Sequence, residues 1–233
     1  MLTPGNRKLG GRRIWGFGLP SGTLDVCPGM SAVCHAHCYA SAVERYRPNA
    51  AAAYQRNLVR SRRRDFVVRL RAFLIAHAVA VVRVHTGGDF YSRGYARKWL
   101  RVMRRSPRVT FYFYTRSWRI PTIRPVIERM AALPNCIVWY SCDRDTGVPA
   151  SVPARVRLAW LATADGDVPP ADLDLMFRIR RLRQQPVAPG GTPVCPGEDG
   201  VRRTRAVTCD RCGVCWHPAR ARRFPLPVIE PTH

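Results

Sequence analysis

The chain has 233 residues and a mass of 26.4 kDa, which suits one folded core or a core with a small added module. Its 46% hydrophobic and 23% charged residues exclude a fibrous repeat and a wholly disordered chain. A formal net charge of +24 favours nucleic acid as a partner of the basic surface, although all but two of the basic residues are arginines, which arginine-rich codon usage would also produce.

Two features bear on the location of the protein. The longest uncharged apolar run, Ala72 to Val82, has eleven residues, whereas a membrane-spanning helix needs roughly 20. The first residues lack the apolar stretch of a secretory signal. We therefore expect no membrane partner and a cytoplasmic location. The pattern predicts no particular oligomeric state.

Helices and strands alternate along the first two thirds of the chain. Amphipathic patterns predict helices over residues 38–59, with an interruption at Pro48, and over 65–77, 91–105 and 121–133. Apolar runs predict strands over residues 13–19, 80–85, 109–114, 137–141 and 156–162. This order predicts an α/β fold with a mainly parallel sheet of about five or six strands, arranged as a partial (β/α) barrel.

The pattern changes after residue 165. Prolines become frequent, a basic run covers residues 178–183, and the last four cysteines follow. We therefore predict two parts: an α/β partial-barrel core over residues 1–165 that carries a three-cysteine loop, and a Pro/Arg-rich cysteine module over residues 166–233, a metal-binding tail that packs on the core.

The first cysteine group consists of Cys27, Cys34 and Cys38. In a reducing compartment, clustered cysteines are more often metal ligands or catalysts than disulfides. Three thiolates in one loop can hold an iron–sulfur cluster and leave its fourth position open for chemistry. His35 or His37 could instead complete a zinc site, and three reduced cysteines without a metal are a further alternative.

The second group consists of Cys195, Cys209, Cys212 and Cys215. Two consecutive C-x2-C steps with a distant fourth cysteine are typical of a ferredoxin-like cluster site. Four thiolates also suit a structural zinc ion, so zinc is the alternative here. The spacing predicts that a metal binds and leaves its identity open.

Polar residues follow each predicted strand, at the edge where functional groups gather in parallel α/β sheets. Two glycines in one of these turns, Gly87 and Gly88, permit close approach to a ligand, and Asp89 is also a plausible helix cap. The candidate catalytic residues at these strand ends are His85, Asp89, Arg116 and Asp143.

Several motifs resemble the phage gene product 88 family. They are the Cys-Pro-Gly at Cys27, the Cys34-x3-Cys38-Tyr39-Ala40 segment, Val84 to Tyr91, Phe113 to Ser117 and the terminal cysteine run. This resemblance implies a protein encoded by a phage or prophage, and therefore the host cytoplasm as its location.

A more distant resemblance is to the radical S-adenosylmethionine enzymes, which carry a three-cysteine loop after the first strand and a Gly-Gly-acidic turn after the next. It implies that Cys27, Cys34 and Cys38 hold a 4Fe–4S cluster whose open iron binds S-adenosylmethionine. It also implies that Tyr39, Gly87, Gly88 and Asp89 line that cofactor and that the last four cysteines hold an auxiliary cluster. The spacing of the three cysteines and the acidic residue of the turn differ from that family's pattern.

The leading hypothesis is an iron–sulfur protein with one or two 4Fe–4S clusters, in which radical chemistry acts on a nucleic acid or nucleoside. One alternative is a non-catalytic, zinc-stapled protein that binds nucleic acid through basic runs at residues 60–64 and 220–223. Another is a redox protein whose clusters only relay electrons.

Overall fold

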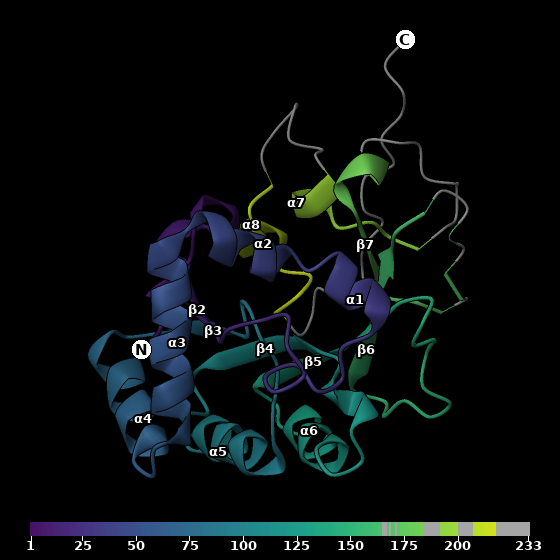
Figure 1. The fold of residues 1–233 in the computed structure, drawn as a ribbon. Coiled ribbons are helices and arrows are strands. Elements are labelled where there is room, and N and C mark those ends of the chain that lie inside the picture. Colours follow the sequence, from purple (N-terminus) through teal and green to yellow (C-terminus); the bar gives the residue numbers. More distant parts are fainter. Residues whose placement is uncertain (165–166, 168, 171, 184–191, 200–206, 218–233) are drawn as a thin grey trace.

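A seven-stranded sheet forms the centre of the molecule (Figure 1). The computed structural model describes the chain except residues 165–166, 168, 171, 184–191, 200–206 and 218–233. Neighbouring strands follow the chain order, and each pair is parallel except β1 and β2. The strands are β1 (Thr3–Pro4), β2 (Ile14–Phe17), β3 (Val81–Val84), β4 (Thr110–Thr115), β5 (Cys136–Cys142), β6 (Val156–Ala162) and β7 (Leu175–Arg178).

This topology confirms the predicted α/β class and the mainly parallel sheet. The sheet is open, with β1 and β7 as its two edges, so it does not form a closed barrel. The five predicted strands correspond to β2–β6, whereas β1 and β7 were not predicted. The boundary predicted at residues 165 and 166 lies outside the described residues, and β7, which follows it in the chain, belongs to the same sheet as the core strands.

Helices connect the strands and cover the sheet. The described α-helices are α1 (Ala32–Ala36), α2 (Tyr39–Tyr46), α3 (Pro48–Arg62), α4 (Phe66–Ala76), α5 (Arg93–Arg104), α6 (Arg124–Ala131), α7 (Pro196–Asp199) and α8 (Cys209–Cys212). Short 3-10 helices lie at η1 (Arg7–Leu9), η2 (Gly11–Arg13), η3 (Ser117–Arg119) and η4 (Arg180–Leu182). The helix start predicted at Pro121 is wrong, because α6 begins at Arg124 and has Pro125 in its first turn.

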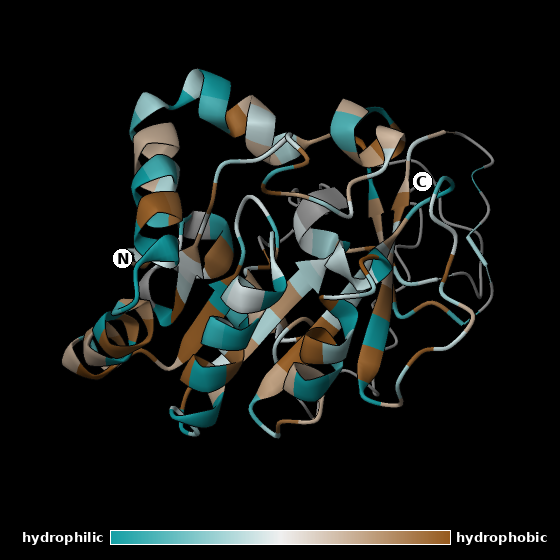
Figure 2. Ribbon diagram, turned by 60° about the horizontal axis from the view of Figure 1, so that its bottom comes forward, coloured by the Kyte–Doolittle hydropathy of each residue, from teal (hydrophilic) through white to brown (hydrophobic). Residues whose placement is uncertain are grey.

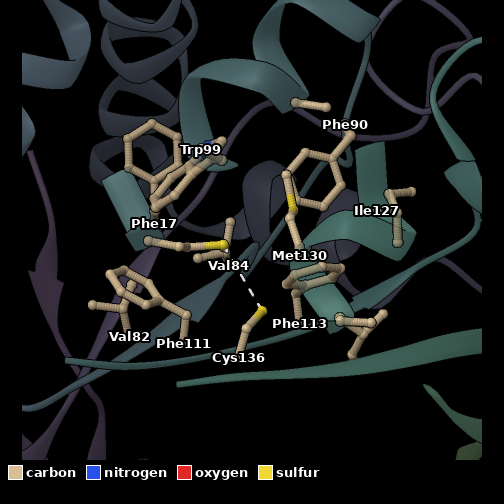
Figure 3. Close-up of a cluster of buried hydrophobic side chains, with 14 of the residues drawn as sticks. Phe17, Val82, Val84, Phe90, Trp99, Phe111, Phe113, Ile127, Met130 and Cys136 are labelled. Atoms are coloured by element: carbon tan, nitrogen blue, oxygen red, sulfur yellow. Dashed lines mark hydrogen bonds between the residues drawn. The ribbon is translucent and has the colours of Figure 1, made fainter. Parts of the chain in front are cut away.

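The larger core lies between the sheet and helices α4–α6. It is built from aromatic and aliphatic side chains that alternate out of β2–β5 and meet the buried faces of these helices (Figure 3). Trp99 of α5, Phe17 and Phe111 are fully buried there. Figure 2 shows brown segments along the strands, and the helices in front of them carry both brown and teal segments. Burial of such side chains, each worth about 1.5–3 kcal/mol, fixes the sheet against the helices.

A second, smaller core covers the opposite face of the sheet. Its strand residues include Val81, Tyr112 and Trp139, and they meet Val214 and Trp216 from the end of the described chain. Helices α1, α2, α7 and α8 lie on this side in Figure 1. Within the described residues, no helix has both the length and the apolar content that crossing a bilayer requires.

Candidate metal centres

Cys27, Cys34 and Cys38, which we call the rim cysteines, lie over the carboxyl ends of β3–β5. Cys34 lies in α1, and Cys38 caps α2, where its sulfur accepts a hydrogen bond from the backbone N of Ser41 at 3.5 Å. Burial raises the pKa of Cys27 to about 12, and the negative charges of Asp89 and of the other two rim cysteines add to this rise. The three thiols therefore lie close enough to act on one another electrostatically.

A buried ion pair lies beside Cys34. Nη2 of Arg116 is 2.9 Å from Oδ2 of Asp143, and the two side chains are 9% and 0% exposed. Burial raises the pKa of Cys34, and the positive charge of Arg116 opposes that rise. Nη1 of Arg116 is buried and has no hydrogen-bond partner among the described residues. The strand ends thus place an ion-paired guanidinium beside Cys34.

The loop after β5 fixes the start of α1. Oγ of Ser31 donates to Oδ2 of Asp143 at 2.7 Å and accepts from the backbone N of Cys34 at 2.9 Å, which is an N-cap. The backbone N of Val33 donates to Oδ2 of Asp145 at 2.9 Å. Two acidic side chains of one loop therefore position the helix that carries the central rim cysteine.

Asp89 joins the end of β3 to the end of β4. Its Oδ1 accepts from the hydroxyl of Thr115 and from the backbone N of Phe90, both at 2.7 Å. Its Oδ2 accepts from the backbone N of Arg116 at 2.8 Å and of Ser117 at 3.1 Å. Both carboxylate oxygens are thus used by the chain itself, which makes Asp89 a structural clamp beside Cys27.

The turn at Gly87 and Gly88 packs on the segment that follows β2. Gly88 has a φ of +72°, and a Cβ added there would lie 2.6 Å from the Cβ of Leu19. The carbonyl of Gly87 accepts from the backbone N of Leu19 at 2.8 Å. The close approach that the glycines allow is therefore made to the chain itself.

His85 lies apart from the other predicted catalytic residues. Its side chain belongs to the aromatic core under α5, with its Nε2 atom 2.8 Å from the hydroxyl of Tyr95 and its ring against Phe90. Burial lowers the pKa of His85 to about 3, so the imidazole is neutral at physiological pH. The structure brings Asp89, Arg116 and Asp143 to the rim cysteines and places His85 in the core.

Cys195, Cys209, Cys212 and Cys215, which we call the inner cysteines, lie against the face of the sheet opposite α4–α6. Helix α8 carries two of them, and Cys195 follows the residue that bridges to β7. Burial raises the pKa of Cys195, Cys209 and Cys215, and the charges of neighbouring inner cysteines raise it further. The four thiols therefore form one group.

Two cations from distant parts of the chain lie beside the inner cysteines. The positive charges of Lys8 and Arg83 oppose the rise that burial causes in the pKa of Cys195 and of Cys209. Nη2 of Arg83 also donates to the hydroxyl of Tyr39 at 2.9 Å, and that hydroxyl donates to the carbonyl of Thr86 at 2.8 Å. Tyr39, expected to line a cofactor, thus links α2 to β3, next to the third rim cysteine.

Hydrogen bonds hold Cys215 to the sheet and Cys209 to Trp216. The hydroxyl of Tyr114 donates to Sγ of Cys215 at 2.9 Å, and Nε1 of Trp139 donates to the carbonyl of Cys215 at 3.0 Å. Nε1 of Trp216 donates to the carbonyl of Cys209 at 2.9 Å. Donors aimed at a cysteine sulfur are one of the features by which proteins set the reduction potential of a cluster.

The donor chemistry of both groups fits a metal centre held by thiolates. All nine cysteines of the chain are free of disulfides, and seven of them form these two groups. In the described residues, however, no set of three or more His, Cys, Asp or Glu side chains stands in an arrangement that could hold a metal ion. Among the described residues, the thiols of each group lie near one another with cations beside them, without forming such an arrangement.

Sequence reasoning missed two cations beside the inner cysteines and the hydroxyl group that donates a hydrogen bond to one of their sulfur atoms. Lys8, Arg83 and Tyr114 are far from these cysteines in the sequence, so no spacing could have indicated them. Ser31 was also missed, although its position three residues before Cys34 is the signal of an N-cap.

Comparisons with known proteins give one family. The family model for gene product 88 matches residues 1–218. The Gene 88 protein of Mycobacterium phage D29 is 31% identical over 210 residues, which cover 85% of this chain and 81% of that protein. The Gene 88 protein of Mycobacterium phage L5 is 32% identical over 140 residues, which cover 55% of this chain and 57% of that protein. No solved structure matches.

Proposed function

The chain belongs to the gene product 88 family, and from this premise we propose that it is a phage iron–sulfur protein whose two cysteine groups each hold a metal centre. The single observation that carries the proposal is the pairing of each thiol group with buried or half-buried cations. Arg116, in its ion pair with Asp143, lies beside the rim cysteines, and Lys8 and Arg83 lie beside the inner cysteines.

The charges explain why this pairing supports a metal. A buried cation is costly unless a negative charge lies near it. Four protonated thiols provide no such charge, whereas four thiolates around a divalent metal or a cluster carry a net negative charge. Thiolates held by a metal at the inner group would place negative charge beside Lys8 and Arg83, and this complementarity supports a metal there.

The two centres would have different tasks. Four inner thiolates complete the coordination of a centre, which suits an electron relay or a structural site. Three rim thiolates leave one ligand position open, at the strand ends where α/β proteins bind their substrates. An iron–sulfur cluster at the rim would supply one-electron chemistry there. Arg116 and Asp143 would orient a ligand, and S-adenosylmethionine is the candidate co-substrate.

Zinc is the second candidate at the inner group, because four clustered thiols suit a tetrahedral zinc ion as well as a cluster. In that case the zinc ion bound by the inner cysteines would hold the segment around Cys209–Cys215 against the sheet and would carry out no redox chemistry. The protein would then act chiefly as a binding protein in the host cytoplasm.

The test is anaerobic reconstitution with iron and sulfide, followed by iron and sulfide analysis, absorption and electron paramagnetic resonance with and without S-adenosylmethionine. Cys34→Ala should remove the rim cluster and Cys212→Ala the inner centre. Cys136→Ala is the matched control, because Cys136 is buried in the larger core and belongs to neither group.

The proposal predicts iron and sulfide in the native chain and in the control, and a partial loss in each of the other variants. A colourless protein with one zinc ion, lost only in Cys212→Ala, would leave zinc at the inner group and overturn the iron–sulfur proposal. A spectrum that changes on addition of S-adenosylmethionine in the native chain and in Cys212→Ala, and not in Cys34→Ala, would identify the rim as its binding site.

A further inference from the structure

The exposed side of α5 carries a row of arginines. Arg93, Arg97, Arg101 and Arg104 recur at helical spacing, and all four are exposed. From the first to the last they cover about 16 Å of helix at 1.5 Å per residue. We call these four residues the α5 arginine row.

The α5 arginine row lacks acidic partners. Between residues 56 and 108 the sequence has only two acidic residues, Asp65 and Asp89. Asp65 pairs with Arg63 and Arg69, and Asp89 is the buried clamp described above. In the described part of the chain, none of the four arginines forms an ion pair. Their charges are therefore left for a partner.

A lysine joins a second basic segment to this helix. Nζ of Lys98 donates to the carbonyls of Ser61, Arg62 and Arg63, at 2.8, 3.1 and 2.9 Å. The end of α3 is thereby held beside α5, and the exposed side chains of Arg62 and Arg64 extend the basic surface. Two segments that are thirty residues apart in sequence thus form one basic surface.

The α5 arginine row lies on a helix whose other side packs in the larger core. The opposite side of α5 is buried in the larger core through Tyr95, Trp99 and Met103, each at most 2% exposed. A lipid-binding helix would instead present its apolar side to the bilayer. Because the apolar side of α5 is already used inside the protein, the exposed charge fits a hydrated polyanion.

We propose that the α5 arginine row, extended by Arg62 and Arg64, binds the phosphate backbone of nucleic acid. A B-form duplex carries a phosphate for about every 3.4 Å of each strand, so several phosphates lie along a surface of this length. Arginines contact phosphates without reading bases, so the binding is independent of sequence. The inference does not depend on either metal centre.

The test measures the affinity of the whole protein for fluorescent 20-base-pair DNA duplexes of two unrelated sequences between about 50 and 200 mM salt. The test variant is R93Q/R97Q/R101Q. The matched control is R45Q/R129Q/R144Q, which removes the same charge from exposed positions elsewhere. Circular dichroism and thermal unfolding establish that both variants are folded.

We expect the native chain to bind both duplexes with an affinity that falls steeply with salt. The slope of log K against log salt changes by about 0.9 for each phosphate contact, so the test variant should lose about 2 to 3 units of slope. The control should keep the native slope within about one unit. Equal losses in the two variants would overturn the proposal, because net charge alone would then account for binding. Binding that requires anionic vesicles and is absent with DNA would also overturn it.

Discussion

The buried carboxylate of Asp89 accepts four hydrogen bonds, and its role is structural in this fold. Asp89→Asn replaces one acceptor oxygen with an NH2 group that faces backbone N–H donors. We expect a loss of about 2–4 kcal/mol in the free energy of unfolding, because buried donors lose their acceptor. Urea unfolding measures it. Asp25→Asn, at an exposed position of the same loop as Cys27, is the control. Equal stability of the two variants would contradict the clamp.

His85 makes stability depend on pH. Its pKa is lowered to about 3 by burial, whereas an unfolded histidine titrates near 6.5. Between these values the unfolded chain takes up a proton that the folded chain does not. The free energy of unfolding should therefore fall as the pH falls through this window, by up to about 1.4 kcal/mol per pH unit.

The variant His85→Gln should remove this contribution. Urea unfolding at several pH values between about 4.5 and 7 measures the slope in both proteins. We expect a flatter pH dependence in the variant, even where the variant is less stable at every pH. An unchanged slope would contradict a buried, neutral His85.

At the scale of elements, α1 has five residues and depends on its cap. Ser31→Ala removes the acceptor for the backbone N of Cys34 and the donor to the buried Asp143, and it should cost about 2 kcal/mol of stability. Alkylation of Cys34 in the metal-free protein should become faster, because α1 frays more often. Ser92→Ala is the matched control, since Ser92 caps α5 in the same way. It should lower stability without changing the rate at Cys34, and equal rates in the two variants would contradict the role of the cap.

Most of the predicted elements have a long apolar pattern. The strands β4–β6 have six or seven residues and the helices α3–α5 have at least eleven, so a period can show, whereas β2 and β3 have four residues each and were predicted from longer apolar runs around them. Helix α1 has five residues and β1 has two, too few to show one. Strand β7 reads Leu-Met-Phe-Arg between a proline-rich segment and a basic run, and it becomes a strand because β6 offers it a partner.

In the candidate sites, too, the sequence predicted what a local pattern shows. Spacing predicted two cysteine groups, and the structure brings the members of each close enough to act on one another electrostatically, whereas their role as metal ligands stays a prediction. The direction of a side chain at a strand end was not predictable. His85 and Asp89 are four residues apart in one turn, yet one enters the core and the other clamps the rim. The cations beside the inner cysteines come together only through tertiary packing.

At the scale of the whole molecule, the inner cysteines join the two ends of the described chain. Helix α8 packs near η1, and Lys8 of η1 lies beside three of the inner thiols. A metal at this group would stabilise the folded state through binding, by about 2.7 kcal/mol at a hundredfold excess over its Kd.

Metal loading should therefore raise the midpoint of thermal unfolding by about 5–10 °C. Thermal unfolding with and without a chelator measures the shift. Cys212→Ala should lose the shift and Cys136→Ala should keep it. A midpoint that is insensitive to metal in the native chain would contradict a metal at the inner group.

Arg83 lies between the inner cysteines and the start of α2. Its guanidinium donates to Tyr39, beside the third rim cysteine, and its charge also acts on Cys195 and Cys209. Oxidation of the inner cysteines would change the electrostatic field at this guanidinium, and with it the hydrogen bond that anchors Tyr39 at the start of α2. Damage to the inner cysteines should therefore reach the start of α2, where Cys38 is the helix cap.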